Sequence, residues 1–551
     1  MSFENTGGRA LMRTIRNYGV DTVFGIPGTH NLEFYRVLGD LGIAAVTTRH
    51  EQGAGYAADG WSQRRGLPGV VITTSGPGLL NALSAAGTAF CESRPLLILS
   101  PGTPRGTGFE DRGLLHESKD PTGAAGSVML WSRRVESDAE AVEAIHDAFR
   151  LFESGRPRPV HIEVPLDVLE AASTAEESAL ERRRFDLAVP EQSGLDAAAR
   201  MLDGASRPVI IAGGGALPAA DELLLLAETL GAPVITSLNG KAAIPESHPL
   251  SLRAELRLAA TLPIIEAADV VLIIGSKVGE AELWGRTLEP RGSIIRIDID
   301  ENRIEANLAA DVAVVGDSRV ALPALRRLLT REPRQPEGLD AIRQAQREEA
   351  DAFSPGVMRL AREITALLPG HATVSGDSSQ ITYYGMTSAV VQEEPKKFLY
   401  MPAYATLGYG LPAAIGAAVA EPDSSVVCVL GDGALMFSVQ ELVTAAEQKL
   451  NLTVVCVDNG GYQEIRENEV DRGIEPVGVE LVQPDWPLLA VAFGGSGHTA
   501  TDYASLRSTL TAAIAEPGVS LVHVPFALFQ PDDADADAAT EKAGDVHAAQ
   551  R

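Results

Sequence analysis

Short apolar runs of strand length alternate with segments of helical periodicity along most of this 551-residue chain. The runs predict buried strands, and the segments between them predict helices. Strands that alternate with helices are typical of parallel, doubly wound α/β sheets that carry helices on both faces. The clearest runs lie at 22–25, 44–47, 69–74, 96–99, 160–164, 208–212, 270–274, 294–298, 426–430 and 452–457.

The chain is too long for one ordinary hydrophobic core, so we expect several domains. The pattern divides into three α/β domains, at residues 1–180, 190–335 and 340–530. A polar segment rich in Ala, Glu and Arg, Glu170–Arg184, has the composition of a linker. The first and third domains look like two versions of the same sheet, although their sequences show no obvious repeat. Residues 531–551 are dominated by Asp and Ala, which predicts a disordered acidic tail.

The clearest candidate site follows the strand at 426–430. The turn Gly431-Asp432-Gly433-Ala434 comes directly after this strand, and the strand at 452–457 ends at Asp458-Asn459. The carboxyl ends of parallel strands share one edge of the sheet, where ligands bind, so the two turns should meet there. Residues after the first turn recur at helical spacing and predict one helix, with Leu435, Val439, Leu442, Val443 and Ala446 on its apolar face and Glu441 and Glu447 on the other.

The atoms at this edge suit a metal-bound diphosphate. Gly433 and Ala434 open a helix, so their free amides and the helix dipole favour a phosphate. Asp432 and Asn459 can each offer one hard oxygen, and the Gly461 carbonyl can offer a third. Magnesium typically takes such a partial shell and completes it with phosphate oxygens and water. Gly-Asp-Gly alone could be a turn with an acidic N-cap, but the second motif favours the metal site.

A second candidate is Glu51, at a junction between a strand and a helix of small residues. A carboxylate in such a tight, poorly solvated setting has a raised proton affinity and suits proton transfer. The alternative is an ordinary acidic residue in the first turn of a helix, where the dipole favours it. Two histidines near turns, His30 and His50, could face the same cavity, although a single histidine in such a place is more often structural.

The paired turns resemble the diphosphate- and metal-binding motif of thiamine diphosphate-dependent enzymes, which runs from Gly-Asp-Gly to Asn-Asn. Here Asp458 stands at the first Asn, whereas Asn459 matches the second, which is the family's metal ligand. The resemblance implies thiamine diphosphate and Mg²⁺ as cofactors. It makes Asp432, Asn459 and the Gly461 carbonyl the metal ligands, and it adds four residues to the cofactor site: Gly431, Gly433, Ala434 and Tyr462.

The segment Arg49–Gly60 is similar to the pyrimidine-domain motif of the same family. The resemblance implies that Glu51 hydrogen-bonds a nitrogen of the cofactor's aminopyrimidine. It also implies that the Ala405 carbonyl and the Leu407 amide hold the pyrimidine, while the Leu407 side chain bends the cofactor. Family members carry a polar residue above the reactive carbon on the loop that here spans residues 102–121, and His116 is the candidate; a solvent-exposed histidine is the alternative.

By this resemblance the three domains are pyrimidine-binding, central and diphosphate-binding. The central domain carries FAD in acetolactate synthases. The stretch between His248 and Pro263 lacks the Gly-and-His segment of those flavin binders, so we expect no flavin. A Gly-rich turn at Gly213–Gly215 is a weak nucleotide signal and fits a tight connection equally well. The first domain of one subunit faces the third domain of another in this family, which implies a homodimer or homotetramer with active sites at the subunit interface.

The implied activity is non-oxidative decarboxylation of a 2-oxo acid to an aldehyde. The closest resemblance is to 5-guanidino-2-oxopentanoate (2-ketoarginine) decarboxylases, on the segments 25–33, 49–55, 115–120 and 159–163. A guanidinium substrate would need a carboxylate partner, for which Glu33, Glu117, Glu464 and Glu467 are candidates unless they are only surface charges. Alternatives are an acetolactate synthase-like carboligase, a regulatory relative that binds cofactor without turnover, and a nucleotide-dependent dehydrogenase.

Composition and charge limit the partners and the cellular compartment that we expect for this protein. The formal charge of −28 disfavours nucleic acid as a partner, and it is compatible with a cationic substrate or with a need for solubility. We find no apolar run long enough to span a membrane and no signal-peptide pattern at Met1–Arg13. The cysteines, Cys91, Cys428 and Cys456, have apolar neighbours and no metal-like spacing, which predicts buried thiols in a reducing cytoplasm.

Overall fold

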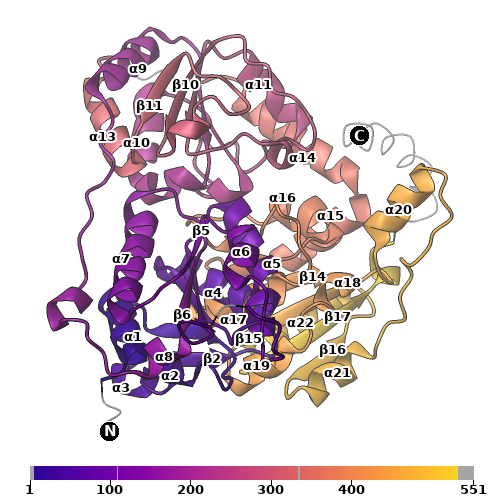
Figure 1. The fold of residues 1–551 in the computed structure, drawn as a ribbon. Helices are drawn as coiled ribbons and strands as arrows, with labels where there is room; N and C mark the ends of the chain where they lie inside the picture. The colour runs from indigo at the N-terminus through magenta and orange to yellow at the C-terminus, as the bar shows by residue number, and fades with distance from the viewer. Residues whose placement is uncertain (1–4, 108, 333–335, 531–551) are drawn as a thin grey trace.

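The computed structural model describes residues 5–107, 109–332 and 336–530. The acidic tail expected at 531–551 lies outside these residues. Figure 1 shows three α/β units, each built on one parallel sheet: the first in indigo and purple, the central one in magenta and pink at the top, and the third in orange and yellow. Each sheet takes all its strands from one of the three predicted segments, so the predicted fold class is confirmed; the precise domain boundaries stay a prediction.

The first sheet has the strand order β2-β1-β3-β4-β6-β5. Its strands are β1 (Thr22–Gly25), β2 (Ala44–Thr47), β3 (Gly69–Ile72), β4 (Leu96–Gly102), β5 (Trp131–Arg134) and β6 (Val160–Pro165). The helices of this unit are α1 (Gly7–Asn17), α2 (Leu32–Tyr35), α3 (Leu38–Leu41), α4 (Glu51–Arg65), α5 (Pro77–Glu92), α6 (Pro121–Gly126), α7 (Asp138–Ser154) and α8 (Leu166–Glu170).

The third sheet, β13-β12-β14-β15-β17-β16, repeats the order of the first strand for strand. The expectation of two versions of one sheet is therefore confirmed. Its strands are β12 (Thr373–Gly376), β13 (Phe398–Leu399), β14 (Val426–Gly431), β15 (Leu452–Asp458), β16 (Ser496–Thr499) and β17 (Val519–Pro525). The helices are α16 (Thr387–Ala389), α17 (Gly410–Ala420), α18 (Asp432–Leu435), α19 (Glu441–Glu447), α20 (Gln463–Asp471), α21 (Trp486–Ala492) and α22 (Tyr503–Ala515), and a π-helical turn spans Ile381–Met386.

The central sheet has the order β11-β10-β9-β7-β8. Its Gly-rich turn is packed against the end of the neighbouring strand: Gly213 N donates to Ile274 O (2.9 Å), and a side chain at Gly213 would lie 2.3 Å from the Gly275 carbonyl oxygen. This packing favours a tight connection. The elements are β7 (Pro208–Ala212), β8 (Val234–Thr236), β9 (Val270–Ile274), β10 (Ser293–Asp298), β11 (Val312–Val315), α9 (Gln192–Gly204), α10 (Ala220–Leu230), α11 (Leu262–Glu266), α12 (Glu280–Leu283) and α13 (Ser318–Leu328), with α14 (Leu339–Phe353) and α15 (Pro355–Thr365) leading to the third unit.

The first and third units pack through two helices that lie side by side, α4 and α17 (Figure 1). Glycines allow their backbones to touch. A side chain at Gly60 would lie 2.1 Å from the Ala413 carbonyl oxygen, and one at Gly416 would lie 1.8 Å from the Ala57 carbonyl oxygen. Because only Gly fits at such a close approach, the small-residue composition of α4 serves this helix crossing. The crossing fixes the helix that begins with Glu51 against the third sheet's unit.

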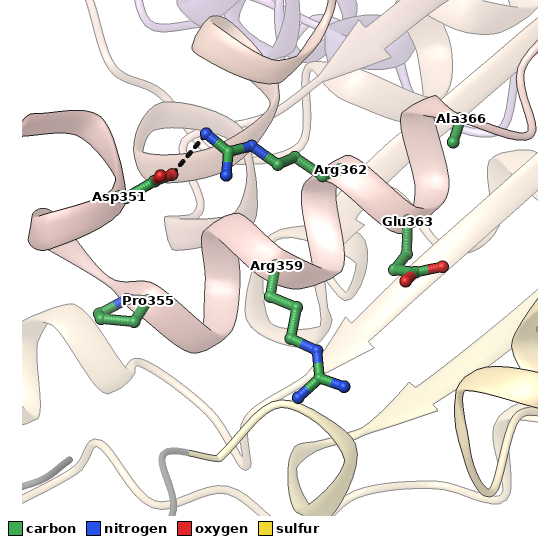
Figure 2. Close-up of a pocket in the computed structure, with 6 residues that line it drawn as sticks. All are labelled: Asp351, Pro355, Arg359, Arg362, Glu363 and Ala366. Carbon is green, nitrogen blue, oxygen red and sulfur yellow. Dashed lines mark ion pairs between the residues drawn. The ribbon is translucent and has the colours of Figure 1, made fainter. Parts of the chain in front are cut away.

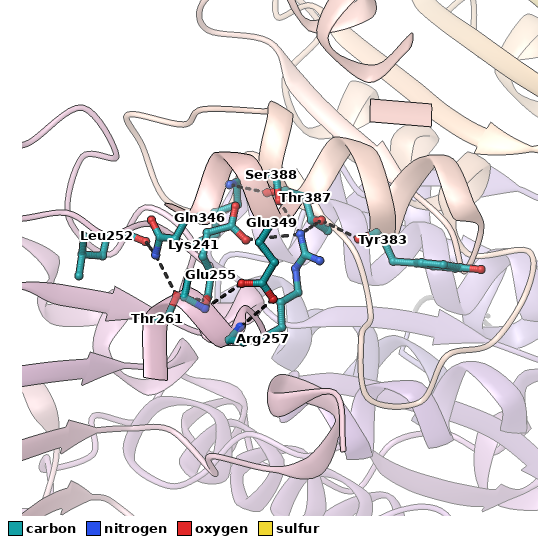
Figure 3. Close-up of polar contacts among 12 residues, drawn as sticks. Lys241, Leu252, Glu255, Arg257, Thr261, Gln346, Glu349, Tyr383, Thr387 and Ser388 are labelled. Atoms are coloured by element: carbon teal, nitrogen blue, oxygen red, sulfur yellow. Dashed lines mark hydrogen bonds and ion pairs between the residues drawn. The ribbon is translucent and has the colours of Figure 1, made fainter. Parts of the chain in front are cut away.

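The central and third units are joined by buried polar contacts, shown in Figure 3. Arg257 Nη2 donates to Thr387 Oγ1 (3.1 Å), and Lys241 Nζ donates to the Thr387 carbonyl oxygen (3.2 Å). Lys241 also pairs with Glu246 at 2.9 Å. Buried charges are expensive to leave unpaired, so these contacts hold the two units in one relative position. None of the helices among the described residues is both long and apolar enough to cross a membrane.

His161 in β6 predicts an acid-sensitive step in stability. The ring is fully buried between the hydroxyls of Ser100 and Ser132, each 2.7 Å from a ring nitrogen, and burial lowers the pKa of His161 to about 3 from 6.5. Between these pH values the unfolded chain binds the additional proton. The contribution to stability from the neutral ring is therefore complete above pH 6.5 and is lost as pH falls toward 3, by on the order of 5 kcal/mol in all. In denaturant unfolding between pH 7 and pH 4, His161→Gln should lose less stability than the wild type; equal slopes would contradict this.

Candidate active site

The two predicted turns meet at the carboxyl edge of the third sheet. β14 and β15 pair in register with Gly431 opposite Val457, so the residues that follow, Asp432 and Asp458, leave the sheet side by side. Asn459 N donates to Asp432 Oδ1 at 3.3 Å. This edge is next to the switch point between β12 and β14, where the order of strands reverses and where ligands bind in such sheets.

Three oxygens converge at this edge. The side-chain oxygen of Asn459 lies 3.1 Å from Asp432 Oδ1 and 3.3 Å from the Gly461 carbonyl oxygen. Asp432 is 1% exposed, and its Oδ2 has no hydrogen-bond partner among the described residues. Neighbouring ligands of a Mg²⁺ ion with bonds of about 2.0–2.1 Å stand about 3 Å apart. The two spacings from the Asn459 oxygen are those of neighbouring ligands in a Mg²⁺ coordination shell, with Oδ2 of Asp432 also at hand.

Burial, together with the nearby charge of Asp458, raises the pKa of Asp432 to about 6. A carboxylate destabilised in this way gains most from a cation. Asp458 itself is turned to other partners: it accepts from Trp486 Nε1 (3.2 Å), His523 Nε2 (3.0 Å) and Gly460 N (3.0 Å). The replacement of the family's first Asn by Asp458 therefore leaves the oxygen cluster intact.

Two glycines of the turn beside the cluster lie close against neighbouring side chains. A side chain at Gly433 would lie 3.0 Å from the ring of Tyr462, and one at Gly431 would lie 3.0 Å from the side chain of Ser379. Ala434 follows within the same helical turn, α18. A larger side chain at either glycine would therefore crowd Tyr462 or Ser379.

The predicted single helix after this turn is wrong. α18 ends at Leu435, the chain turns at Met436–Gln440, and α19 begins at Glu441. The reason lies in Glu441, which is fully buried instead of solvated: its carboxylate accepts hydrogen bonds from Arg49 N (3.0 Å) and His50 N (3.1 Å). The turn aims this carboxylate at the first helical turn of α4. With only one turn, α18 has little dipole with which to favour a phosphate.

Glu51 lies at the start of α4, 7% exposed, at the carboxyl edge of the first sheet. Asn81 Nδ2 of α5 donates to its Oε2 at 3.0 Å, and a side chain at Gly78 would lie 3.2 Å from its Oε1. Asn81 is exposed, as is its neighbour Leu80. The carboxylate therefore lies below an open surface of the first unit.

His116 lies on the loop that follows β4, next to His30. The two rings are 5.3 Å apart and edge to face, and His30 Nδ1 is 2.7 Å from Ser75 Oγ. His116 has a positive φ of 59°, and its buried Nδ1 has no hydrogen-bond partner among the described residues. Backbone strain clusters at functional sites, and a buried polar atom without a partner needs an explanation. His50, in contrast, is the N-cap of α4 and accepts from Gln52 N, which is a structural role.

The segment with Ala405 and Leu407 is held by a residue that sequence reasoning missed. Asp377 follows β12, is fully buried, and accepts from Gly408 N (3.2 Å) and Gly410 N (2.7 Å). Burial raises the pKa of Asp377 to about 6. Ala405 has a positive φ of 51°, and the Leu407 carbonyl oxygen is 3.4 Å from Gln52 Nε2 of α4. The predicted pyrimidine-holding segment thus lies next to the helix that begins with Glu51.

A surface hollow of about 450 Å³ lies elsewhere, over α15 (Figure 2). Its wall includes the ion pair of Arg362 with Asp351 at 2.6 Å. The other lining residues are Pro355, Arg359, Glu363 and Ala366. It contains none of the predicted site residues, so we place the candidate active site at the two sheet edges and not in this hollow.

The architecture, with polar groups gathered at the carboxyl edges of two matching parallel sheets, is that of a ligand-binding α/β protein, and comparison with known proteins specifies the family. Three domain models of thiamine pyrophosphate enzymes match the chain: the N-terminal TPP binding domain at residues 5–120, the central domain at 195–325 and the C-terminal TPP binding domain at 380–524. The chain belongs to the thiamine pyrophosphate (thiamine diphosphate) enzyme family. This confirms the resemblance inferred from the two motifs.

Curated relatives cover nearly the whole chain. A probable 2-ketoarginine decarboxylase, AruI of Pseudomonas aeruginosa, is 39% identical over 524 residues, which is 94% of both chains. The acetolactate synthase isozyme 1 large subunit of Escherichia coli is 30% identical over 94% of this chain and 93% of its own. A probable acetolactate synthase large subunit of Methanocaldococcus jannaschii is 31% identical over 87% and 86%. This chain is therefore a thiamine diphosphate-dependent enzyme of the group that contains decarboxylases and acetolactate synthases.

Proposed function

We propose that this enzyme is a Mg²⁺-dependent 2-oxo acid decarboxylase that converts 5-guanidino-2-oxopentanoate to 4-guanidinobutanal. The assignment of this substrate rests on the 39% identity, across 94% of both chains, to a probable 2-ketoarginine decarboxylase. The reaction takes a 2-oxo acid anion and a proton to an aldehyde and carbon dioxide. Thiamine diphosphate supplies the electron sink for the carbon–carbon cleavage. The proposal includes no flavin.

We propose that the metal ion binds at the cluster of three oxygens. Asp432, Asn459 and the Gly461 carbonyl would hold Mg²⁺, and the amides at Gly433 and Ala434 would receive the diphosphate. The convergence of three oxygens at 3.1 and 3.3 Å, with the unpartnered Asp432 Oδ2, supports this assignment. Glu51 would hold the aminopyrimidine, with the Ala405 carbonyl and the Leu407 amide on its other side.

We propose a homodimer or homotetramer with the site at the subunit interface. The surfaces beside the site expose large apolar side chains, which is typical of a contact surface. Leu80 is 48% exposed next to Asn81, Leu115 is 63% exposed next to His116, and Phe437 is 48% exposed after α18. A second copy of the chain would cover these residues and exclude water from the Glu51 carboxylate.

The candidate carboxylates for a substrate guanidinium differ in their partners. Glu33 makes a double hydrogen bond to Arg36 Nε and Nη2, and Glu117 accepts from the backbone amides of its own loop, including Gly113 N at 2.8 Å. Glu464 and Glu467 lie on α20, beside the metal edge. Their carboxylates accept from Gln380, and Glu464 also accepts from Tyr383 and Tyr384. Because they lie beside the oxygen cluster, they are the pair that we propose to face the guanidinium.

The test is an assay of carbon dioxide release from 5-guanidino-2-oxopentanoate, pyruvate and branched 2-oxo acids, with aldehyde and acetoin-type products separated. We expect the guanidino acid to give the highest kcat/KM and an aldehyde. A second candidate, an acetolactate synthase-like carboligase, is favoured by the relatives at 30–31% identity. Turnover of pyruvate alone, with acetolactate as the product, would overturn the proposed function in favour of this alternative.

His116 is the proposed proton donor to the carbon that has lost carbon dioxide. His116→Gln should lower the rate of aldehyde formation by about 10²-fold and raise the share of carboligated product, because general acid catalysis contributes on that scale. Product ratios from one substrate measure this directly. His248→Gln, in the central unit, is the matched control and should leave the ratio unchanged. An unaltered product ratio in His116→Gln would remove His116 from this role.

A further inference from the structure

The side chain of Gln380 lies between α20 and the oxygen cluster of Asp432, Asn459 and Gly461. It follows β12 in a polar loop, and it contacts residues from two distant segments. Its Oε1 accepts from Asn459 Nδ2 at 3.2 Å. Its Nε2 donates to Glu467 Oε2 at 2.9 Å and to Glu464 Oε2 at 3.1 Å. Both N–H groups of the amide are thus directed at carboxylates.

The orientation of Gln380 is determined by these carboxylates. Ionised carboxylates only accept hydrogen bonds, so the amide nitrogen has to face them and the amide oxygen has to face away. Glu464 is itself held by the hydroxyls of Tyr383 (3.0 Å) and Tyr384 (3.2 Å). Burial first, and then the charge of Glu464, raise the pKa values of both tyrosines, which therefore keep their protons and donate. These tyrosines belong to the π-helical turn, a feature that is frequent at functional sites.

The orientation of Asn459 follows from that of Gln380. With the Gln380 oxygen facing Asn459, the amide group of Asn459 has to turn its nitrogen toward Gln380. Its oxygen then faces Asp432 Oδ1 and the Gly461 carbonyl oxygen. Considered alone, these two oxygens would favour the reverse orientation, in which the Asn459 nitrogen donates to them and blocks the cation site. Reversal would bring the Asn459 oxygen against the Gln380 oxygen, and turning Gln380 as well would aim that oxygen at two carboxylates.

We infer that Gln380, oriented by Glu464 and Glu467, is a positioning residue that keeps the Asn459 oxygen directed at the metal. This inference rests on the proposed metal site. Each hydrogen bond in this series has a fixed donor and acceptor. The tyrosine O–H groups donate to the Glu464 carboxylate, and the Gln380 N–H groups donate to the two carboxylates. The Asn459 N–H then donates to the Gln380 oxygen. The chain of donors leaves one lone-pair-bearing oxygen free for the cation. Such outer partners orient ligands before the metal binds.

The test measures binding of Mn²⁺ with thiamine diphosphate to the apo enzyme, by calorimetry and by the electron paramagnetic resonance signal of free Mn²⁺. Gln380→Met keeps the shape of the side chain but removes the acceptor, so Asn459 is free to reverse. We expect the affinity for Mn²⁺ to fall about 10–100-fold, as for other outer partners of metal ligands. Gln463→Met is the matched control: Gln463 Nε2 donates to Glu467 Oε1 (2.9 Å) but does not contact Asn459, and its loss should leave the affinity unchanged.

A double-mutant cycle separates orientation from damage to the fold. A carboxylate presents an oxygen in either orientation, so Gln380→Met should cause no further loss of affinity in the N459D background. An unchanged affinity in Gln380→Met, or equal losses with and without N459D, would overturn the inference. Failure of the wild type to bind Mn²⁺ with thiamine diphosphate would instead overturn the proposed metal site. Thermal unfolding of each variant identifies any that fails to fold, and Gln380→Leu is then the replacement.

Discussion

Glu51→Gln is expected to lower turnover of the 2-oxo acid by at least about 10²-fold while thiamine diphosphate stays bound. The loss follows from the proposed role, because a glutamine cannot take or hold the proton that a carboxylate exchanges with the aminopyrimidine, and such proton transfer contributes about 10²–10⁴-fold. Cofactor binding should persist because the metal, the diphosphate amides and the Leu407 segment all belong to the third unit.

The structure makes Glu51→Gln a mild change apart from its charge. The side chain is 7% exposed, and the amide oxygen can still accept from Asn81 Nδ2 if the amide nitrogen points toward the cofactor. The measurement pairs a single-turnover assay with calorimetric binding of thiamine diphosphate and Mg²⁺. Near-normal turnover in this variant would remove the proposed role of Glu51.

Glu33→Gln is the matched control for charge removal in the same domain. Glu33 is a buried glutamate of α2 whose carboxylate pairs with Arg36 at 2.8 Å. This substitution should lower the stability of the first unit and leave turnover by the folded enzyme unchanged. A comparable loss of turnover in both variants would indicate that any buried charge change in this unit inactivates the enzyme.

Most strands of the sheets could be predicted because they are local, continuous apolar runs, whereas the polar edge strands β5 (Trp131–Arg134) and β16 (Ser496–Thr499) could not. β14 and β15 are such runs, and both are buried along their whole length. The break between α18 and α19 could not be predicted in this way. The spacing of Leu435, Leu442 and Ala446 suits one helix, but Glu441 is buried by its contacts with the backbone of Arg49 and His50, which lie almost 400 positions earlier. Tertiary contacts of this kind override local periodicity.

The residues of the candidate site also fall into those that the sequence alone could place and those whose role only the fold reveals. Asp432, Asn459 and Gly461 follow directly from strand ends, so the sequence places them at one sheet edge without knowledge of the rest. Gln380 lies in the loop that follows β12, and its role depends on Glu464, which comes from α20. Asp377 likewise acts through Gly408 and Gly410. Hydrogen-bond polarity between distant segments is visible only once the fold brings them together.

Asp432→Asn is expected to lower the affinity for Mg²⁺ and thiamine diphosphate by roughly 10²-fold or more, and with it all turnover at ordinary cofactor concentrations. Loss of an outer partner alone weakens metal binding about 10–100-fold, and Asp432 is proposed to touch the ion and to supply the carboxylate among its three protein ligands. An amide at this position also places a donor where the unpartnered Oδ2 now lies. Calorimetric titration of the apo enzyme with Mg²⁺ at saturating thiamine diphosphate measures the change.

Asp458→Asn provides the comparison that gives this prediction its specificity. Asp458 lies beside Asp432 and carries the same charge, but it accepts from Trp486 and His523 on the other side of the strand end. Asn is also the residue that the family motif has at this position. The Asp458→Asn variant should therefore bind the cofactor with an affinity close to that of the wild type. It should lose some stability because the contact with His523 is broken. If both variants lost affinity equally, the total negative charge at the sheet edge, and not direct ligation by Asp432, would account for metal binding.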